Sequence, residues 1–180
     1  MKTARRVEDR HLVIVKQACE LTELDEVRSL LRAFVAWLRK RYVEDIALID
    51  RYFGDDAFEQ ELAELPGKYA PPAGSLLIAY ALGKPAGCVA LTDLGPGICE
   101  MKRLFVDTQF RGMGVGRALV DQAIVGAKAS NYHLIRLLTG KGQHEAVRLY
   151  ERFGFTRVAP YYEITDQQLK DWLIFFELKL

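Results

Sequence analysis

The sequence predicts one α+β domain in which helices cover both faces of a mixed sheet. The main observation is the apolar pattern, which alternates between helical spacing and strand-like runs along the 180 residues. Its order is strand, two helices, three strands, helix, strand, helix, strand, strand. The length also suits one domain with a substantial core, and no repeat, low-complexity tract or linker divides residues 1–180.

The first 70 residues contain one predicted strand and two predicted helical regions. The run HLVIVKQA at 11–18 predicts the strand. Apolar residues at helical spacing follow, and Thr22 with Asp25 forms a plausible cap, so we expect a helix that begins near residue 23. A second helical region covers roughly 46–65, with Gly54 as a point where it can break. It ends at LPGKYAPPAG, whose prolines and glycines exclude regular structure.

Strand-like runs dominate the rest of the chain. Gly-Lys-Pro and Gly-Pro-Gly separate runs at 75–81, 86–93 and 98–106, and these turn signals predict an antiparallel meander. A helix at about 114–129 follows. The remaining predicted elements are a strand at 133–139, a helix at 143–153 and two final strands, the last of them in DWLIFFELKL at 171–180.

Composition argues against several classes of function. The net charge is +1, from 25 basic and 24 acidic side chains, so no bulk field attracts nucleic acid or a membrane surface. The first apolar run, LVIV, is too short for an export signal, and no apolar stretch is long enough to span a bilayer. Cys19, Cys88 and Cys99 are widely spaced and the histidines are scattered. We therefore expect no disulfide framework, no metal site and a cytoplasmic protein.

Three glycines, Gly112, Gly114 and Gly116, alternate between a predicted strand and a predicted helix. Their spacing fits neither the P-loop nor the Gly-x-Gly-x-x-Gly dinucleotide fingerprint. Glycines nevertheless let backbone amides approach an anion, and the positive end of the following helix points to the same place. Arg111 and Arg117 flank the loop and add charge. The glycines alone leave a simple chain reversal equally open, whereas the flanking strand and helix favour anion binding.

Residues 100–156 resemble the core of the general-control-related N-acetyltransferase (GNAT) superfamily. Its signature Gln/Arg-x-x-Gly-x-Gly/Ala is matched by Arg111, Gly114 and Gly116, a better match than the register that begins at Gln109. Its later segment Ala-x-x-Leu-Tyr-x-x-x-Gly-Phe is matched at 146–155. The resemblance is good over 75–180 and rests on element order before that. It implies a mostly antiparallel sheet of six to seven strands flanked by about four helices.

The resemblance also implies a site for acetyl-CoA, with no metal. The strand at 98–106 would splay away from the strand at 133–139, its backbone would pair with the pantetheine arm, and the glycine loop would hold the pyrophosphate. Gln143 stands where many members carry Asn, so its side chain reaches one methylene further. The implied cofactor-binding residues are Leu104, Phe105, Val106, Arg111, Gly112, Met113, Gly114, Val115, Gly116, Arg117 and Gln143.

Two residues are candidates for the proton transfers. The resemblance implies that Tyr150 donates a proton to the leaving thiolate; the alternative is a packing tyrosine. Glu100 is the candidate general base, directly or through water, and a surface ion pair with Lys102 is the alternative. Alternation puts Glu100 on the same face as Lys102, Leu104 and Val106 unless a bulge shifts the pattern. Cys99 lacks a partner at a recognisable spacing, which favours a buried thiol over a nucleophile.

The predicted function is transfer of an acetyl group from acetyl-CoA to a primary amine of a small molecule or peptide, in a ternary complex. The alternative is a non-catalytic acyl-CoA-binding regulatory domain. Dimerisation is frequent in the family, and the apolar last strand is available for a homodimer. Aromatic residues could contact the amine acceptor without identifying it; these are Trp37, Tyr42, Tyr52, Phe53, Tyr161 and Tyr162.

Overall fold

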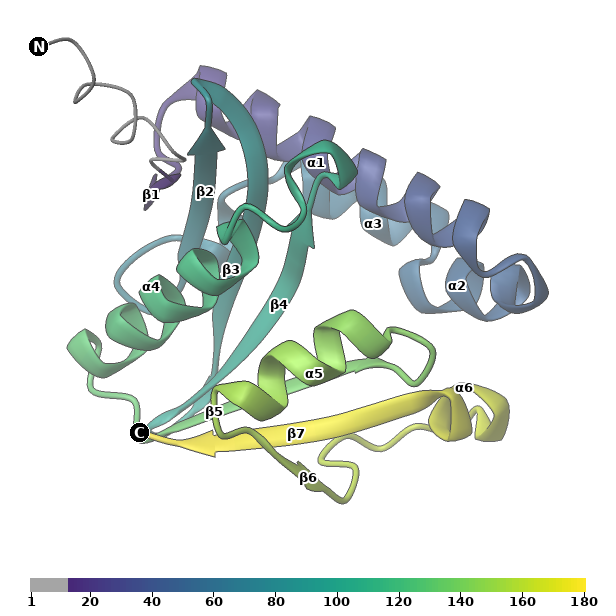
Figure 1. The fold of residues 1–180 in the computed structure, drawn as a ribbon. Helices are drawn as coiled ribbons and strands as arrows, with labels where there is room; N and C mark the ends of the chain where they lie inside the picture. The colour runs from purple at the N-terminus through teal and green to yellow at the C-terminus, as the bar shows by residue number, and fades with distance from the viewer. Residues whose placement is uncertain (1–12) are drawn as a thin grey trace, which may run out of the picture.

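One seven-stranded sheet forms the middle layer of the computed structural model, which describes residues 13–180 (Figure 1). The strand order is β1-β2-β3-β4-β5-β7-β6. Within the described residues β4 and β5 are parallel and every other neighbouring pair is antiparallel. The strands are β1 (Val13–Gln17), β2 (Ser75–Ala81), β3 (Lys84–Gly95), β4 (Ile98–Val106), β5 (Leu134–Gly140), β6 (Thr156–Val158) and β7 (Leu173–Lys179). The predicted α+β class with a mostly antiparallel sheet is confirmed.

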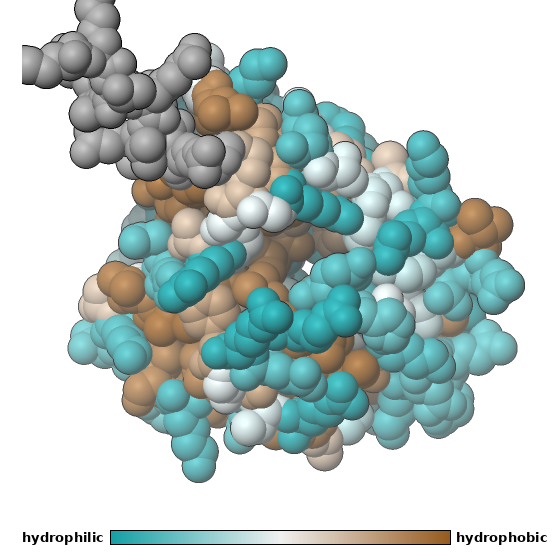
Figure 2. Space-filling view, viewed as in Figure 1, coloured by the Kyte–Doolittle hydropathy of each residue, from teal (hydrophilic) through white to brown (hydrophobic). Residues whose placement is uncertain are grey.

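Helices cover both faces of this sheet, as expected. In the view of Figure 1, α4 and α5 lie in front of the strands. The same view in space-filling form shows mostly hydrophilic side chains around a central hollow (Figure 2). The helices are α1 (Leu21–Arg41), α2 (Ile46–Phe53), α3 (Asp55–Ala63), α4 (Val115–Ala129), α5 (His144–Arg152) and α6 (Gln167–Trp172).

The described residues contain six α-helices where about four were expected. One addition comes from the region 46–65, which breaks into α2 and α3 at Gly54, a residue with φ of 55°. The other is α6, whose last two residues, Asp171 and Trp172, were expected to open the final strand. Asp166 starts this short helix by accepting a hydrogen bond from the amide of Leu169 at 3.1 Å.

Near the N-terminus the predicted strand is confirmed, whereas the start and the cap of the following helix need correction. The strand predicted at 11–18 is observed as β1, and its first two residues lie outside the described part of the chain. Helix α1 begins at Leu21, two residues earlier than expected, and Thr22 is not its cap. Instead the Glu23 carboxylate accepts hydrogen bonds from the amides of Cys19 and Glu20, at 2.8 and 3.0 Å. A side chain of the first turn therefore reaches back to cap the helix.

The last strand, which was expected to be available for a homodimer, lies within the sheet. β7 pairs with β5 along its whole length and with β6 on its other side. On the side of β6 the pairing covers only Phe175, Phe176 and Glu177, so the ends of β7 have no strand partner there among the described residues.

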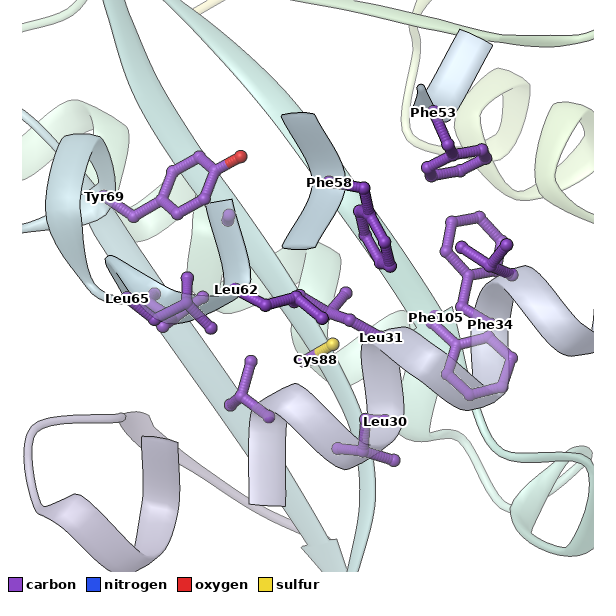
Figure 3. Packing of buried hydrophobic residues seen from close by; sticks show 14 of the residues in the cluster. Leu30, Leu31, Phe34, Phe53, Phe58, Leu62, Leu65, Tyr69, Cys88 and Phe105 are labelled. Carbon is purple, nitrogen blue, oxygen red and sulfur yellow. The ribbon is translucent and has the colours of Figure 1, made fainter. Parts of the chain in front are cut away.

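The two faces of the sheet bury separate apolar cores. The core beneath α1, α2 and α3 is rich in aromatic side chains (Figure 3). Phe34 packs edge-on against Phe53, with ring centroids 5.9 Å apart, and Phe53 packs in the same way against Phe58 at 5.4 Å. Phe105 of β4 meets Phe34 from the sheet side, at 5.3 Å. The core on the opposite face lies under α4 and α5 and includes Tyr150.

A bulge in β4 decides which side chains reach each core. The register with β3 passes from Cys88↔Phe105 to Ala90↔Lys102, so β4 has one extra residue between these pairs. Arg103, at this point, has φ of 59°. From here on the expected alternation is shifted: Arg103 and Phe105 share the α1–α3 face with Glu100. The prediction that put Leu104 and Val106 on the face of Glu100 is therefore wrong, because both pack in the opposite core with Met101.

A largely buried ion pair, with side chains 10% and 11% exposed, holds this bulge. The Arg103 guanidinium donates two hydrogen bonds to the Glu61 carboxylate of α3, at 2.8 and 3.0 Å, and lies 5.1 Å from the Phe53 ring centroid. Burial by itself raises the pKa of Glu61. The hydrogen bond and charge of Arg103, with hydrogen bonds from Lys68 and Tyr69, outweigh burial and lower this pKa to about 2. The pair thus ties α3 to the strained point of β4.

We predict that Glu61→Gln lowers the free energy of unfolding at pH 7 by about 3 kcal/mol, because Arg103 keeps a buried charge without a counter-charge. Because the pKa of Glu61 is lower in the folded state, the ionised carboxylate stabilises that state above about pH 4.5. This stabilisation is lost as the pH falls towards 2. Stability should therefore fall less steeply over that interval in the variant than in the wild type. Urea unfolding at pH 7, 4 and 3 measures both effects.

Glu59→Gln is the matched control, because Glu59 pairs with Arg32 at 2.7 Å on the surface, where both side chains are more than half exposed. We expect little change in stability for this variant, since exposed ion pairs contribute little. Equal losses in the two variants would contradict a special role for the buried pair.

Candidate active site

The site begins where β4 and β5 separate. These parallel strands pair only at Ile98↔Leu134, Cys99↔Ile135 and Glu100↔Arg136. Beyond Glu100, β4 diverges from β5, and Figure 1 shows the two strands opening from a shared corner. This is the splay that the resemblance implied. Among the described strands, none therefore lies beside this edge of β4 from Met101 onward.

A groove with a volume of about 470 Å³ occupies the outer part of this opening. It runs between the end of β4, the glycine loop and α5, with Phe34 and Trp37 of α1 on its far wall. Of the eleven residues expected to bind a cofactor, only Met113 is not among those lining it. Met113 packs instead against the core beneath α4.

The glycine loop brings the start of α4 to the groove. Gly112 and Gly114 have φ of 81° and 83°, a region that favours glycine, although a Cβ at either would meet no atom within 4 Å. Backbone conformation rather than space therefore selects glycine at these two positions. No side chain caps α4, and the first amides of a helix have no partner within it. Such amides form an anion site at the positive end of the helix.

Arginines surround this part of the groove. Arg111 stacks on the Trp37 ring, 4.2 Å from its centroid, and its Nε donates to the Val106 carbonyl at 3.3 Å. Arg148 and Arg152 of α5 line the groove as well, together with Arg117. Sequence analysis missed the pair on α5. The four-residue spacing of Arg148 and Arg152, which puts them on one helix face inside the second motif, could have indicated it.

The inner end of the opening is a narrow slot of about 50 Å³ that contains Glu100. Glu100 is 1% exposed, yet its carboxylate is well satisfied. Oε1 accepts from the Tyr161 hydroxyl at 3.0 Å, and Oε2 accepts from the Tyr162 hydroxyl at 2.9 Å and from Lys102 Nζ at 2.8 Å. The predicted pair with Lys102 thus exists, but in a buried setting rather than on the surface.

Tyr150 lines the same slot from α5. Its ring packs against Phe155 and Phe176, with centroids 5.8 and 6.1 Å away. Burial, and then the neighbouring Tyr52, raise the pKa of Tyr150, so its hydroxyl keeps its proton at neutral pH. The Tyr150 hydroxyl forms no hydrogen bond with another described residue. Tyr150 therefore packs in the core and also offers a hydroxyl that can donate a proton.

The other aromatic candidates divide among different places. Tyr52 and Phe53 line the slot, whereas Trp37 lines the outer groove. The Tyr42 hydroxyl donates to the Gly142 carbonyl at 3.0 Å, a contact that joins the end of α1 to the loop before α5. The slot also contains Trp172, which sequence analysis did not single out because it was expected in a strand.

The Acetyltransferase (GNAT) family model matches residues 32–155 of the chain. The chain belongs to this family. An uncharacterized N-acetyltransferase of Schizosaccharomyces pombe is 42% identical over 58% of this GNAT protein and 65% of its own length. The IAA acetyltransferase of Azospirillum brasilense is 33% identical over 69% of this chain and 82% of its own. The prediction of an acyltransferase is confirmed at the level of the family.

Solved structures support the same fold. A GNAT-family acetyltransferase of Staphylococcus aureus has a TM-score of 0.70 at 20% identity, covering 93% of this chain and 99% of its own. The PaiA N-acetyltransferase of Thermoplasma acidophilum, solved in complex with coenzyme A, has a TM-score of 0.68 at 16% identity, covering 94% and 99%. At these identities the likeness concerns the fold alone.

No helix within residues 13–180 is long and apolar enough to cross a bilayer. Within the same residues, no group of three or more His, Cys, Asp or Glu side chains is arranged to hold a metal ion.

The cysteines differ in exposure. Cys19 lies at the surface, whereas Cys88 and Cys99 are buried. Burial raises the pKa of each buried thiol to about 12, with Arg103 partly opposing the rise at Cys88 and Asp93 adding to it at Cys99. This favours the buried-thiol interpretation of Cys99, since the thiolate is the nucleophilic form.

We predict that a disulfide reagent such as 5,5′-dithiobis(2-nitrobenzoate) titrates one thiol quickly in the native protein at pH 8. That thiol is Cys19, because it alone of the three cysteines is exposed. All three should react after denaturation in guanidinium chloride. Cys19→Ser should abolish the fast phase, and a fast phase that persisted in this variant would show a reactive buried thiol.

Proposed function

We propose that this GNAT-family protein transfers an acetyl group from acetyl-CoA to a primary amine of a small molecule or peptide. The observation that carries the proposal is a continuous path along splayed β4. It leads from the arginine-lined start of α4 to a buried slot that contains Glu100 and Tyr150. Zebrafish N-acetylaspartate synthetase, 34% identical over 58% of this chain and 38% of its own, and the IAA acetyltransferase are named for different acceptors. The acceptor is therefore proposed only as an amine.

The groove residues fit the parts of acetyl-CoA. Amides of the loop 111–116 would bind the pyrophosphate, and Arg111 and Arg117 would add charge-assisted contacts. The open backbone edge at Leu104, Phe105 and Val106 would pair with the amides of the pantetheine arm. Gln143 lines both the groove and the slot, so its amide is in reach of the junction between them.

In the proposed reaction the amine attacks the thioester directly, without a covalent enzyme intermediate. A nitrogen–carbon bond forms while the carbon–sulfur bond breaks. Glu100 takes the proton of the amine, directly or through water, and Tyr150 gives its proton to the departing thiolate. Three hydrogen bonds occupy part of the acceptor capacity of Glu100, and a carboxylate can accept about four, which leaves room for the amine or a water.

The proposed location is the cytoplasm. It is supported by the absence of a disulfide among the described residues, since Cys19, Cys88 and Cys99 are all free thiols.

We predict that acetyl-CoA at about one hundred times its Kd raises the melting temperature by several degrees, because ligand binding to the folded state contributes about 2.7 kcal/mol. Gly114→Ala should weaken acetyl-CoA binding at least about tenfold, since φ of 83° strains any residue with a Cβ. Gly126→Ala is the matched control near the C-terminal end of α4, where an added Cβ meets nothing within 4 Å. Calorimetric titration and thermal unfolding measure both effects; equal affinities in the two variants would contradict the proposed pyrophosphate site.

We also predict that Tyr150→Phe lowers kcat about 100-fold or more and leaves the Kd for acetyl-CoA nearly unchanged, since only proton donation is removed. The assay follows thiol release from acetyl-CoA with amines, amino acids, aminoglycosides and peptides. Tyr132→Phe is the control, because that hydroxyl binds the Ala73 carbonyl and the Asp93 carboxylate outside the groove. Unchanged kcat in Tyr150→Phe would remove it from the acid role. Binding without thiol release for every acceptor would favour the regulatory alternative.

A further inference from the structure

The inner slot has apolar side chains in its wall and, besides the Tyr150 hydroxyl already assigned to proton donation, an unpaired indole donor. Phe34, Leu38, Leu138 and Leu173 supply apolar wall, and the slot holds only about 50 Å³. An acceptor that reaches Glu100 must therefore widen the slot. The acceptor then contacts the side chains of the slot wall. Among these groups is the Trp172 indole, which is 5% exposed.

The Trp172 indole nitrogen has no hydrogen-bond partner among the described residues. The indole packs closely against Gly140, which also lines the slot. A Cβ added to Gly140 would lie 2.9, 3.0 and 3.3 Å from Cζ2, Cη2 and Cε2 of the indole, so only glycine leaves room for the ring in this place. A buried N–H without an acceptor destabilises the protein that contains it. A ligand oxygen that meets this nitrogen removes that destabilisation.

The charge around this donor favours a neutral partner. The two cations that line the slot are already paired: Lys102 with Glu100 at 2.8 Å, and Arg103 with Glu61 at 2.8 Å. A carboxylate held only by a neutral N–H in an apolar wall remains a desolvated charge, which is costly. A neutral carbonyl in the same place needs only one hydrogen bond to be satisfied.

We propose that the acceptor carries a neutral carbonyl beside its amine, as an amino amide or the N-terminal residue of a peptide does. In this arrangement the amine faces Glu100, and the Trp172 N–H donates to the carbonyl oxygen. Trp172 is then a substrate-binding residue that selects among amines. The inference deepens the proposed function and rests on it for the identity of the reaction, but its content is a binding preference that can be measured without turnover.

The test uses binding to the CoA-loaded protein, measured by isothermal titration calorimetry at fixed pH. Three matched sets serve as probes: alaninamide, ethylamine and alanine; leucinamide, 3-methylbutylamine and leucine; phenylalaninamide, 2-phenylethylamine and phenylalanine. In at least one set we expect the amide to bind at least about tenfold more tightly than the amine that lacks the carboxamide, equivalent to about 1.4 kcal/mol. The free amino acid should bind more weakly than its amide.

Trp172→Phe keeps an aromatic ring but removes the donor, and it should reduce the amide preference to about twofold or less. Comparison of the preference between wild type and variant cancels the different basicities of the amines. Trp37→Phe, the same substitution in the outer groove, should keep the preference, whatever its effect on CoA affinity. Unchanged CoA affinity and melting temperature in Trp172→Phe show that the fold is intact.

Either of two results would overturn the inference: no amide preference in any set, or a preference that survives in Trp172→Phe. Thiol release from acetyl-CoA, measured in parallel, tests the proposed function separately. A Trp172-dependent preference without thiol release would uphold the acceptor class as a binding property and count against catalysis. Thiol release without such a preference would support catalysis and count against the proposed acceptor class.

Discussion

The structure of the site depends on the ion pair between Arg103 and Glu61. It lies at the bulge of β4, where an extra residue is inserted just beyond the last pairing with β5. Without the bulge, Leu104 and Val106 would share a face with Glu100. With it, Glu100 faces the slot, Leu104 and Val106 pack beneath α4, and the edge of β4 stays open. A positive φ at Arg103 costs free energy, and the buried bidentate pair with α3 offsets that cost.

A charge gradient along the opening follows from the elements that meet there. The outer groove collects the positive end of α4 and arginines from the loop and from α5. The inner slot contains a buried carboxylate whose oxygens are held by two tyrosine hydroxyls and one lysine. A molecule with an anionic tail and a neutral reactive end would enter such a gradient in one orientation. An ammonium group would be drawn to the opposite end, which gives the two proposed substrates distinct places.

Local patterns predicted much of the fold and part of the site. Some features depend only on turn-forming residues that are close together in the sequence, so the sequence alone located them. These are the meander, the break at Gly54 and the glycine loop. The β4 bulge was harder, because it depends on Arg103 meeting Glu61 from forty-two positions earlier in the chain. Trp172 was missed for a related reason. The residues that follow it have strong strand propensity, and only the structure shows that Trp172 ends a short helix and lies in the slot wall, packed against Gly140.

Glu100 illustrates how one buried group can serve structure and chemistry together. An isolated carboxylate at 1% exposure would be strongly destabilising, so its three hydrogen bonds are needed for the fold. Two of them come from Tyr161 and Tyr162, which thereby fix the segment between β6 and α6 against the sheet. That segment leads directly into α6 and Trp172. The carboxylate proposed to accept a proton from the amine is therefore connected, through this segment of chain, to the donor proposed to recognise the carbonyl beside it. A substitution at Glu100 would disturb both, which is why acceptor selection is better examined at Trp172 itself.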